Sequence, residues 1–368
     1  MRTAAWLGAL LGVSFTTCFV TGLTSHLIHH PPSRFEWPAR PAGLYRVSQG
    51  VHVATGIASV PLLLAKLWTV YPHFWASPPV RSIAHGIERL TLLPLVGGSL
   101  FMLVTGTMNL ARWYAFGFDF TATHYAVAWI TVGGLVAHVG AKWAVARAAL
   151  WPPRTADPTA PATPSPPRTG GVSRRGFLGA VGAGAGVLTL VTAGQTVHPL
   201  RALSVLGPRD PAVGPQGFPV NKSAVGAGVV AAATDPAFRL TVDGIVARRL
   251  SLSLDDLRSL PQHEATLPIA CVEGWSASAR WRGVRVRDLL DMAGAPRSAT
   301  ARVVSLQARS RYRTSDLHAG QLDDPDTLLA LEVNGEPLHL DHGYPLRLIA
   351  PNRPGVQQTK WVTRVIAR

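Results

Sequence analysis

Long stretches without charged residues dominate the first half of this chain and restrict what it can fold into. No Asp, Glu, Lys or Arg occurs between Arg2 and Arg34. A helix that crosses a lipid bilayer needs about 20 apolar residues, and four such windows precede residue 150, at residues 4–23, 47–68, 90–111 and 120–141. Charged residues make up only 15% of the 368-residue chain, below the rough quarter that is usual for soluble domains. The pattern predicts an all-α transmembrane bundle of four helices over residues 1–150.

A fifth uncharged run of 25 residues lies between Arg175 and Arg201 and predicts a further anchoring helix within residues 173–200. Residues 151–172, before it, are rich in Pro, Thr and Ala and predict a flexible cytoplasmic linker. The segment that leads into the run, Ser-Arg-Arg-Gly-Phe-Leu at residues 173–178, resembles the twin-arginine signal that exports folded, cofactor-loaded domains. The alternative interpretation is an ordinary cationic flank of a membrane helix.

The distribution of cations predicts the orientation of these helices. Residues 1–175 contain 14 Lys/Arg and only 4 Asp/Glu, and the region between the fourth and fifth runs is cytoplasmic by the positive-inside rule. The connections 25–45 and 111–123, and everything after about residue 200, are then expected outside the cytoplasmic membrane, on the periplasmic side. No basic stripe with interleaved aromatic residues occurs, so a lipid bilayer is the expected partner and nucleic acid is not. The cytoplasmic cations are Lys142, Arg147, Arg154, Arg168, Arg174 and Arg175.

Histidines within the apolar runs suggest a haem. Ionisable residues inside membrane spans indicate a functional site, and eight of the 13 histidines precede residue 150. His52 lies six residues after Arg46 and His124 five residues after Asp119, and both helices are expected to start at the outer face. The two imidazoles are therefore expected at similar depth in the membrane, as bis-histidine haem ligation requires. We therefore expect one outer haem b on this pair, with His26 as a competing ligand. The alternative is a haem-free bundle whose histidines bond to backbone or water.

A second, inner haem is left open by the sequence. His138 lies 14 residues after His124, about 21 Å further along the helix and close to the same face. The matching levels of the other helices, near Trp6, Leu62 and Leu93, contain no histidine. The helix number and histidine positions resemble the di-haem four-helix cytochrome b family, in which quinol is oxidised or quinone reduced within the bilayer. That resemblance implies the quinone pool as a partner.

The region from Phe218 onward has a different character and predicts an α+β domain within residues 201–368. Strand-like runs alternate with short helical patterns, and Ser253 followed by two aspartates is typical of a helix start. The expected strands are residues 238–242, 302–306, 346–350 and 361–366, and the expected helices are residues 253–260 and 286–292.

Cys271 is the single cysteine of this exported region, so it cannot form an internal disulfide there. It is a buried thiol, an intermolecular link or a ligand for a redox metal. A strand, then Cys-Val-Glu-Gly-Trp-Ser at residues 271–276 and Trp-Arg-Gly-Val at 281–284, resembles the sulfite-oxidase-type molybdopterin domain. Asp-His-Gly-Tyr-Pro-Leu-Arg-Leu-Ile-Ala-Pro at residues 341–351 and Thr-Lys-Trp-Val at 359–362 extend the resemblance.

The resemblance implies a molybdopterin cofactor and a set of residues that bind it. In the family, one cysteine ligates molybdenum beside the pterin dithiolene, which implies Cys271 as metal ligand and catalytic residue. A His, an Arg and a Lys contact the pterin and its phosphate, an asparagine contacts the cofactor early in the domain, and one strand serine is expected to face it. The cofactor-binding residues implied here are Asn221, Cys271, Ser305, His342, Arg347 and Lys360.

The two resemblances together predict a membrane-anchored, molybdopterin-dependent oxidoreductase. The chain ends seven residues after Trp361, where sulfite oxidases add a dimerisation domain. It is thus more similar to shorter bacterial members such as the catalytic subunit of periplasmic methionine sulfoxide reductase. Electrons are expected to pass between molybdenum, haem b and quinone, with sulfite, a sulfoxide or another small oxo compound as substrate. One alternative is a non-catalytic electron-transfer or sensory protein with a degenerate molybdopterin fold, and another is the enzyme without haem.

Overall fold

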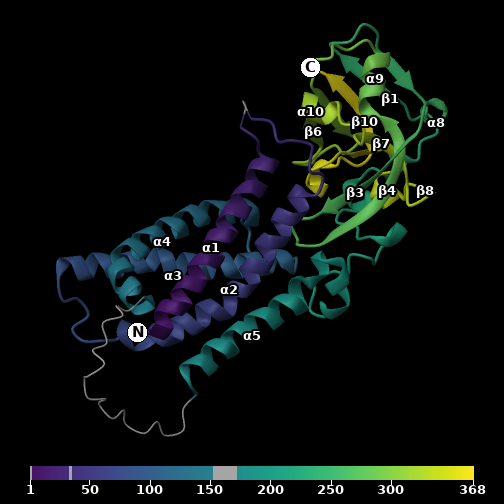
Figure 1. Cartoon of the computed structure of the whole chain (residues 1–368). Coiled ribbons are helices and arrows are strands. Elements are labelled where there is room, and N and C mark those ends of the chain that lie inside the picture. The colour runs from purple at the N-terminus through teal and green to yellow at the C-terminus, as the bar shows by residue number, and fades with distance from the viewer. Residues whose placement is uncertain (1, 33–34, 152–171) are drawn as a thin grey trace. The chain divides into compact units, whose positions relative to one another are not determined.

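The computed structural model describes residues 2–32, 35–151 and 172–368. The predicted linker at residues 151–172 lies almost wholly outside the described residues. The chain divides into two compact units (Figure 1). The helical unit comprises Met1–Gly22, Val51–Gly194 and Leu203–Pro208, and the mixed unit comprises Leu23–Gly50, Gln195–Ala202 and Arg209–Arg368.

Five long helices form the first half of the chain. Each is long and apolar enough to cross a membrane by length and composition, which confirms the expectation of five apolar helices. The first four extend beyond their apolar windows at one or both ends. Their bounds are α1 (Arg2–His29), α2 (Leu44–Phe74), α3 (Ile83–Leu110), α4 (Phe120–Leu150) and α5 (Arg174–Ala193).

Small and polar residues bring these helices together. A Cβ atom added at Gly134 of α4 would lie 3.1 Å from the backbone nitrogen of Leu95 in α3, so these two helices approach closely at the glycine. Ser14 of α1 and Ser59 of α2 share a buried hydrogen bond of 2.9 Å. Close approach at small residues is the packing that apolar helices use where water supplies no driving force.

The start of α5 coincides with the pair of arginines. The side chain of Ser173 accepts a hydrogen bond of 3.0 Å from the backbone N–H of Gly176, so Ser173 is the N-cap and the arginines form the first helical turn. The helix ends at Ala193, earlier than the uncharged run, and the chain continues in the 3₁₀ turns η1 (Gly194–Thr196) and η2 (His198–Leu203).

Two five-stranded sheets build the mixed unit. The first has the order β2-β1-β10-β5-β6, and the second has the order β3-β4-β7-β8 with β9 paired to β7. Within the described residues, β1 and β10 pair in parallel and the other pairings are antiparallel. The strands are β1 (Leu240–Gly244), β2 (Leu250–Leu252), β3 (His263–Ala270), β4 (Ser276–Arg285), β5 (Ala301–Ser305), β6 (Thr314–Leu317), β7 (Leu328–Val333), β8 (Glu336–Pro337), β9 (Arg347–Ile349) and β10 (Val362–Ala367).

The strands and helices expected from the sequence are confirmed in β1, β5, β9 and β10 and in two helices. These are α8 (Leu254–Ser259) and α9 (Val286–Met292). Ser253 caps α8 in a capping box, because its hydroxyl accepts from the Asp256 N–H and the Asp256 carboxylate accepts from the Ser253 N–H. The other short elements are α6 (Ala224–Ala227), α7 (Val230–Ala233), α10 (Ala319–Leu322), η3 (Pro215–Gly217), η4 (Leu340–His342) and η5 (Gly355–Gln357).

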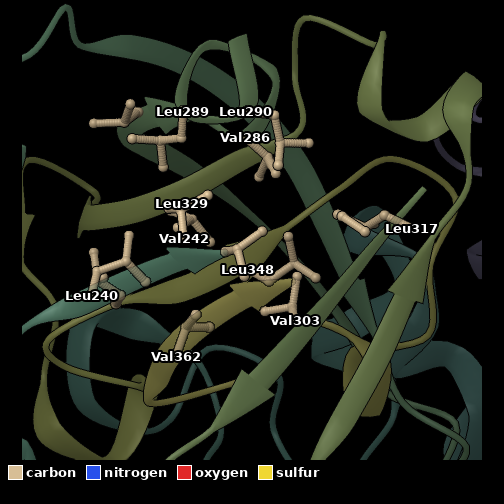
Figure 2. Close-up of a cluster of buried hydrophobic side chains, with 14 of the residues drawn as sticks. Leu240, Val242, Val286, Leu289, Leu290, Val303, Leu317, Leu329, Leu348 and Val362 are labelled. Atoms are coloured by element: carbon tan, nitrogen blue, oxygen red, sulfur yellow. The ribbon is translucent and has the colours of Figure 1, made fainter. Parts of the chain in front are cut away.

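The main apolar core of the mixed unit lies between α9 and the strands (Figure 2). Helix α9 contributes Val286, Leu289 and Leu290, whose spacing places them on one helical face. Val242 of β1 and Leu348 of β9 are among the strand residues that meet them, and all five side chains are fully buried. Burial of each such side chain contributes about 1.5–3 kcal/mol to folding, so this core holds the strand ends in place.

Residues 23–50, here called the α1–α2 connection, belong to the mixed unit. Asn352 fixes this connection through three hydrogen bonds. Its backbone N–H donates to the Ala42 carbonyl at 3.1 Å, its Nδ2 donates to the Pro38 carbonyl at 2.7 Å, and its Oδ1 accepts from the Tyr45 N–H at 3.0 Å. The bidentate ion pair of Arg40 with Asp324 adds a second anchor.

Candidate functional site

Cys271 lies in the loop that joins β3 to β4. Its N–H donates to the Trp275 carbonyl at 3.0 Å, and its carbonyl accepts from the Gly274 N–H at 3.1 Å. Gly274 has a φ of +88°, a left-handed conformation that favours glycine. The thiol is 4% exposed, and burial, with a smaller effect of the Glu273 carboxylate, raises its pKa to about 12. A thiol of this kind becomes a thiolate when a metal replaces its proton.

Asn221 contacts the Cys271 thiol directly. Its Nδ2 donates to the Cys271 sulfur at 2.8 Å, so two residues that the resemblance implied separately for cofactor binding, 50 positions apart, are in contact. Arg209 links the two segments, because its Nη1 donates to the Val220 carbonyl at 2.9 Å and its Nε lies 3.5 Å from Glu273 Oε2. The sequence analysis missed Arg209, which belongs to no motif.

Three basic side chains predicted to contact the cofactor form one cluster, here called the cationic pocket, in which His342 and Arg347 are buried and Lys360 is half-buried. Arg347 Nη1 donates to the His342 carbonyl at 3.0 Å, and Lys360 Nζ donates to the carbonyls of Asp341 and Lys222, each at 2.7 Å. Gly343 makes this closeness feasible. Its φ is +118°, and a Cβ atom there would lie 3.2 Å from atoms of both Arg347 and Lys360.

The pocket is strongly electropositive and poor in compensating charge. Burial lowers the pKa of His342 to about 3, of Arg347 to about 9 and of Lys360 to about 7, and the neighbouring cations contribute for His342 and Lys360. Within the described residues, Arg347 Nε is buried without a hydrogen-bond partner. Buried cations of this kind are stabilised by an anion with several oxygens. The pocket therefore fits the phosphate of a pterin cofactor.

Ser305 supports this pocket from the end of β5. Its hydroxyl donates to the Lys360 carbonyl at 2.8 Å and accepts from the Gln307 N–H at 3.2 Å. Gln307 in turn accepts a hydrogen bond of 2.8 Å from Lys222 Nζ. Ser305 thus holds the main chain of Lys360, while Lys222 and Gln307 join the pocket without a signal in the sequence that singled them out.

His342 is held by contacts on two sides. Its ring stacks on Phe218 with centroids 3.8 Å apart, and its Nε2 donates to the Pro215 carbonyl at 2.7 Å. Because Nε2 is engaged, Nδ1 is the ring nitrogen that is left for a hydrogen bond to the cofactor.

His52 and His124 face each other in the helical unit, as their positions along α2 and α4 predict. The ring centroids are 6.3 Å apart. A metal–imidazole bond is about 2 Å and the bonded nitrogen lies about 1 Å from the ring centre, so two imidazoles that share one iron have centroids about 6 Å apart. The spacing therefore fits an iron between the two rings.

The surroundings of the two rings favour ligation through Nε2. His52 Nδ1 donates to the Cys18 carbonyl at 2.8 Å, and His124 Nδ1 shares a hydrogen bond of 3.0 Å with the Thr105 hydroxyl. A hydrogen bond at one ring nitrogen orients the other toward a metal. Gly22 also makes room for the His52 ring, since a Cβ atom there would lie 2.9 Å from His52 Cε1.

The neighbours of the two further histidines considered as haem ligands, His26 and His138, are different ones. His26 belongs to the α1–α2 connection, and its ring lies 4.9 Å from that of His30. His138 Nδ1 is buried without a hydrogen-bond partner among the described residues. The charged groups that act on His138 are Lys66 and the ion pair of Lys142 with Glu88, and none of these is a second imidazole.

Residues 227–368 match the oxidoreductase molybdopterin binding domain. Mitochondrial sulfite oxidase of Rattus norvegicus is 33% identical over 155 residues, which cover 35% of this chain and 28% of the relative. A protein of Azospira oryzae named as a protein-methionine-sulfoxide reductase subunit, YedZ1, is 35% identical over 125 residues, which cover 34% and 47%. The sulfane dehydrogenase SoxCD structure from Paracoccus pantotrophus matches with a TM-score of 0.34 and 25% identity, over 37% of this chain and 40% of that chain.

These matches show a molybdopterin-binding oxidoreductase domain of the sulfite oxidase type. They confirm the predicted oxidoreductase and its molybdopterin cofactor. The chain spans less than half of the length of the relatives named above.

Proposed function

We propose that this protein is a membrane-anchored molybdopterin oxidoreductase that passes electrons between an outward-facing molybdenum centre and a haem b, and from there to or from the quinone pool. The substrate is a small sulfur oxo compound, sulfite or a sulfoxide. In one direction, sulfite and water give sulfate, two protons and two electrons. In the other, a sulfoxide with two protons and two electrons gives a sulfide and water.

One observation carries the molybdenum part of this proposal. It is that one unit contains both the Cys271 sulfur, a potential metal ligand that Asn221 contacts, and the cationic pocket of Arg347 and Lys360. Molybdenum in a pterin dithiolene supplies two-electron oxygen-atom chemistry when bound. The protein's part is to provide the thiolate of Cys271, to hold the cofactor phosphate with Arg347 and Lys360, and to orient the pterin with His342. The presence of all these residues argues against a degenerate, non-catalytic domain.

The haem part rests on His52 and His124. Their spacing fits one iron, and both Nδ1 atoms have hydrogen-bond partners that leave Nε2 for the metal. A haem converts a two-electron reaction into one-electron steps, as exchange with a quinone pool through a cytochrome requires. We propose one haem, since His138 has no second imidazole beside it among the described residues.

The proposed topology places the mixed unit outside the cytoplasmic membrane. Its support is the excess of cations between α4 and α5, and the pair of arginines in the first turn of α5. We propose that this pair is a twin-arginine export signal and that residues 151–172 form a cytoplasmic linker. The domains are then residues 1–150 for the cytochrome-b-like part, 173–200 for the fifth helix and 201–368 for the exported oxidoreductase.

The direct test is reduction of the haem by substrate. Sulfite is added without oxygen to the full-length protein in detergent, and the haem absorption spectrum is followed. The proposal expects the haem to become reduced in the wild type and to stay oxidised in Cys271→Ser. For the reverse direction, quinol-reduced protein is expected to lose its reduced-haem spectrum on addition of a sulfoxide. A wild-type haem that responds to neither substrate, in protein that contains molybdenum, would contradict the proposal.

A further inference from the structure

The start of helix α2 packs on the loop that carries Cys271. Ala42 contacts the apolar cluster that includes Cys271, Tyr45 packs against Ala270, and Gln49 Nε2 donates to the Val272 carbonyl at 3.3 Å. Tyr45 and Gln49, four residues apart, lie on one face of α2, and Ala42 lies in the turn just before the helix. The α1–α2 connection therefore contacts residues on both sides of Cys271.

Tyr45 is fixed in this contact from both of its ends. Its side chain is 1% exposed, its N–H donates to Asn352 Oδ1, and its hydroxyl shares a hydrogen bond of 3.1 Å with His29 Nε2. His29 is fixed in turn, because its carbonyl accepts from Gln357 Nε2 at 2.9 Å. A phenol and an imidazole that are held in this way form a pre-organised pair of hydrogen-bonding groups.

Several basic groups lie near His29. The rings of His29 and His30 have centroids 6.2 Å apart, and Arg311 and Arg353 both lie within electrostatic range of His29. Arg353 is buried at 6% exposure, and its Nε has no hydrogen-bond partner among the described residues. Tyr45 itself lies within electrostatic range of Cys271. Tyr45 thus lies near the thiol that would ligate the metal, and His29 lies near cationic side chains.

We infer that the α1–α2 connection supplies part of the substrate site, in which His29 and Tyr45 bind the oxygens of an oxyanion substrate such as sulfite. The inference rests on the proposed function. It assigns contacts with the substrate to a segment that the sequence analysis predicted to be part of the membrane domain. Hydroxyl and imidazole groups donate hydrogen bonds to oxyanions, and nearby guanidinium groups favour a negative charge. A neutral sulfoxide gains less from such surroundings than sulfite does.

The test compares Tyr45→Phe and His29→Gln with the wild type in the full-length, molybdenum-loaded protein. The readouts are steady-state oxidation of sulfite with ferricyanide as the electron acceptor, and the change that sulfate causes in the Mo(V) electron paramagnetic resonance spectrum. Loss of one hydrogen bond to a charged oxygen is expected to raise KM for sulfite about tenfold while kcat changes less than about threefold. The sulfate concentration needed for half of the spectral change should rise by a similar factor.

A matched control and the failing outcomes separate this inference from the function on which it rests. His73→Gln makes the same change at an exposed histidine of the helical unit and should leave both readouts unchanged. Unchanged KM and sulfate response in both variants would overturn the inference, and so would loss of molybdenum from both, which would make the residues structural. A wild type that contains molybdenum but acts only on neutral sulfoxides would overturn the inference alone. A wild type without molybdenum would overturn the proposed function as well.

Discussion

The two candidate cofactor sites of this protein are built in different ways. The molybdopterin site collects Asn221, Cys271, Arg347 and Lys360 from segments up to 139 residues apart, and backbone carbonyls, glycines and buried polar side chains hold each of them. The proposed haem site consists of two histidines on two helices, each with one or two hydrogen-bond partners. The difference teaches that a site made from loops and strand ends needs a supporting network, whereas a site on helices needs little more than the right depth.

The sharpest way to break this comparison is to remove the metal ligand of the first site alone. Cys271→Ser is expected to lower sulfite-dependent turnover by at least about 10³-fold, because a serine hydroxyl does not replace a soft thiolate ligand of a redox metal. The haem absorbance should remain that of the wild type. Full turnover in this variant would contradict the role of Cys271.

The converse change removes one ligand of the second site. His124→Ala is expected to abolish the haem spectrum and to lower quinone-linked turnover by about 10²-fold, since electrons lose their path to the pool. Molybdenum content and sulfite oxidation with a soluble acceptor should stay close to wild type. His73→Ala, at an exposed histidine near the end of α2, serves as the control. Retention of the full haem spectrum in His124→Ala would show that another residue ligates the iron.

Acid should distinguish the two units in protein that lacks the molybdenum cofactor. Burial lowers the pKa of His342 to about 3 from an ordinary value of 6.5, so between these values the unfolded chain binds more protons than the folded one. The contribution of His342 to the stability of the mixed unit is therefore complete above about pH 6.5 and falls as the pH decreases, by about 2 kcal/mol at pH 5. Thermal unfolding of the mixed unit at pH 7 and pH 5 measures this loss. His342→Gln should flatten the dependence, and an equally steep dependence in that variant would assign the effect elsewhere.

The smallest expected effect tests the scaffold without touching either site. Ser253→Ala removes the cap of α8 and should lower the free energy of unfolding of the mixed unit by about 1 kcal/mol. Ser251→Ala, at an exposed strand position, should change it by much less. Molybdenum and haem contents should be unaffected by both, and a loss of either cofactor in Ser253→Ala would show that the cap supports a site.

Helix geometry explains why the sequence alone predicted the histidine pair. A rise of 1.5 Å per residue converts the offsets of His52 and His124 from the helix starts into similar depths, and the structure brings their rings together. The same reasoning did not reveal the glycine that makes room for the His52 ring. That contact depends on how α1 packs on α2, which no single helix encodes.

The molybdopterin site was predictable only through its motifs. Local patterns gave β1, β5, β9 and β10, but nothing in the periodicity placed Asn221 on the thiol of Cys271 or Lys360 beside Arg347. Long-range pairing of strands and loops sets these contacts. The α1–α2 connection was also assigned wrongly for this reason. Its apolar pattern predicted that it belongs to the membrane domain, whereas residues 23–50 belong to the mixed unit.

The central claim is that one chain holds both a molybdenum and an iron centre, and elemental analysis of the detergent-purified full-length protein tests it most directly. The account predicts about one molybdenum and one iron per chain when the host makes both cofactors. Iron without molybdenum would contradict the assigned role of Cys271 and the cationic pocket. Molybdenum without iron would contradict the haem at His52 and His124.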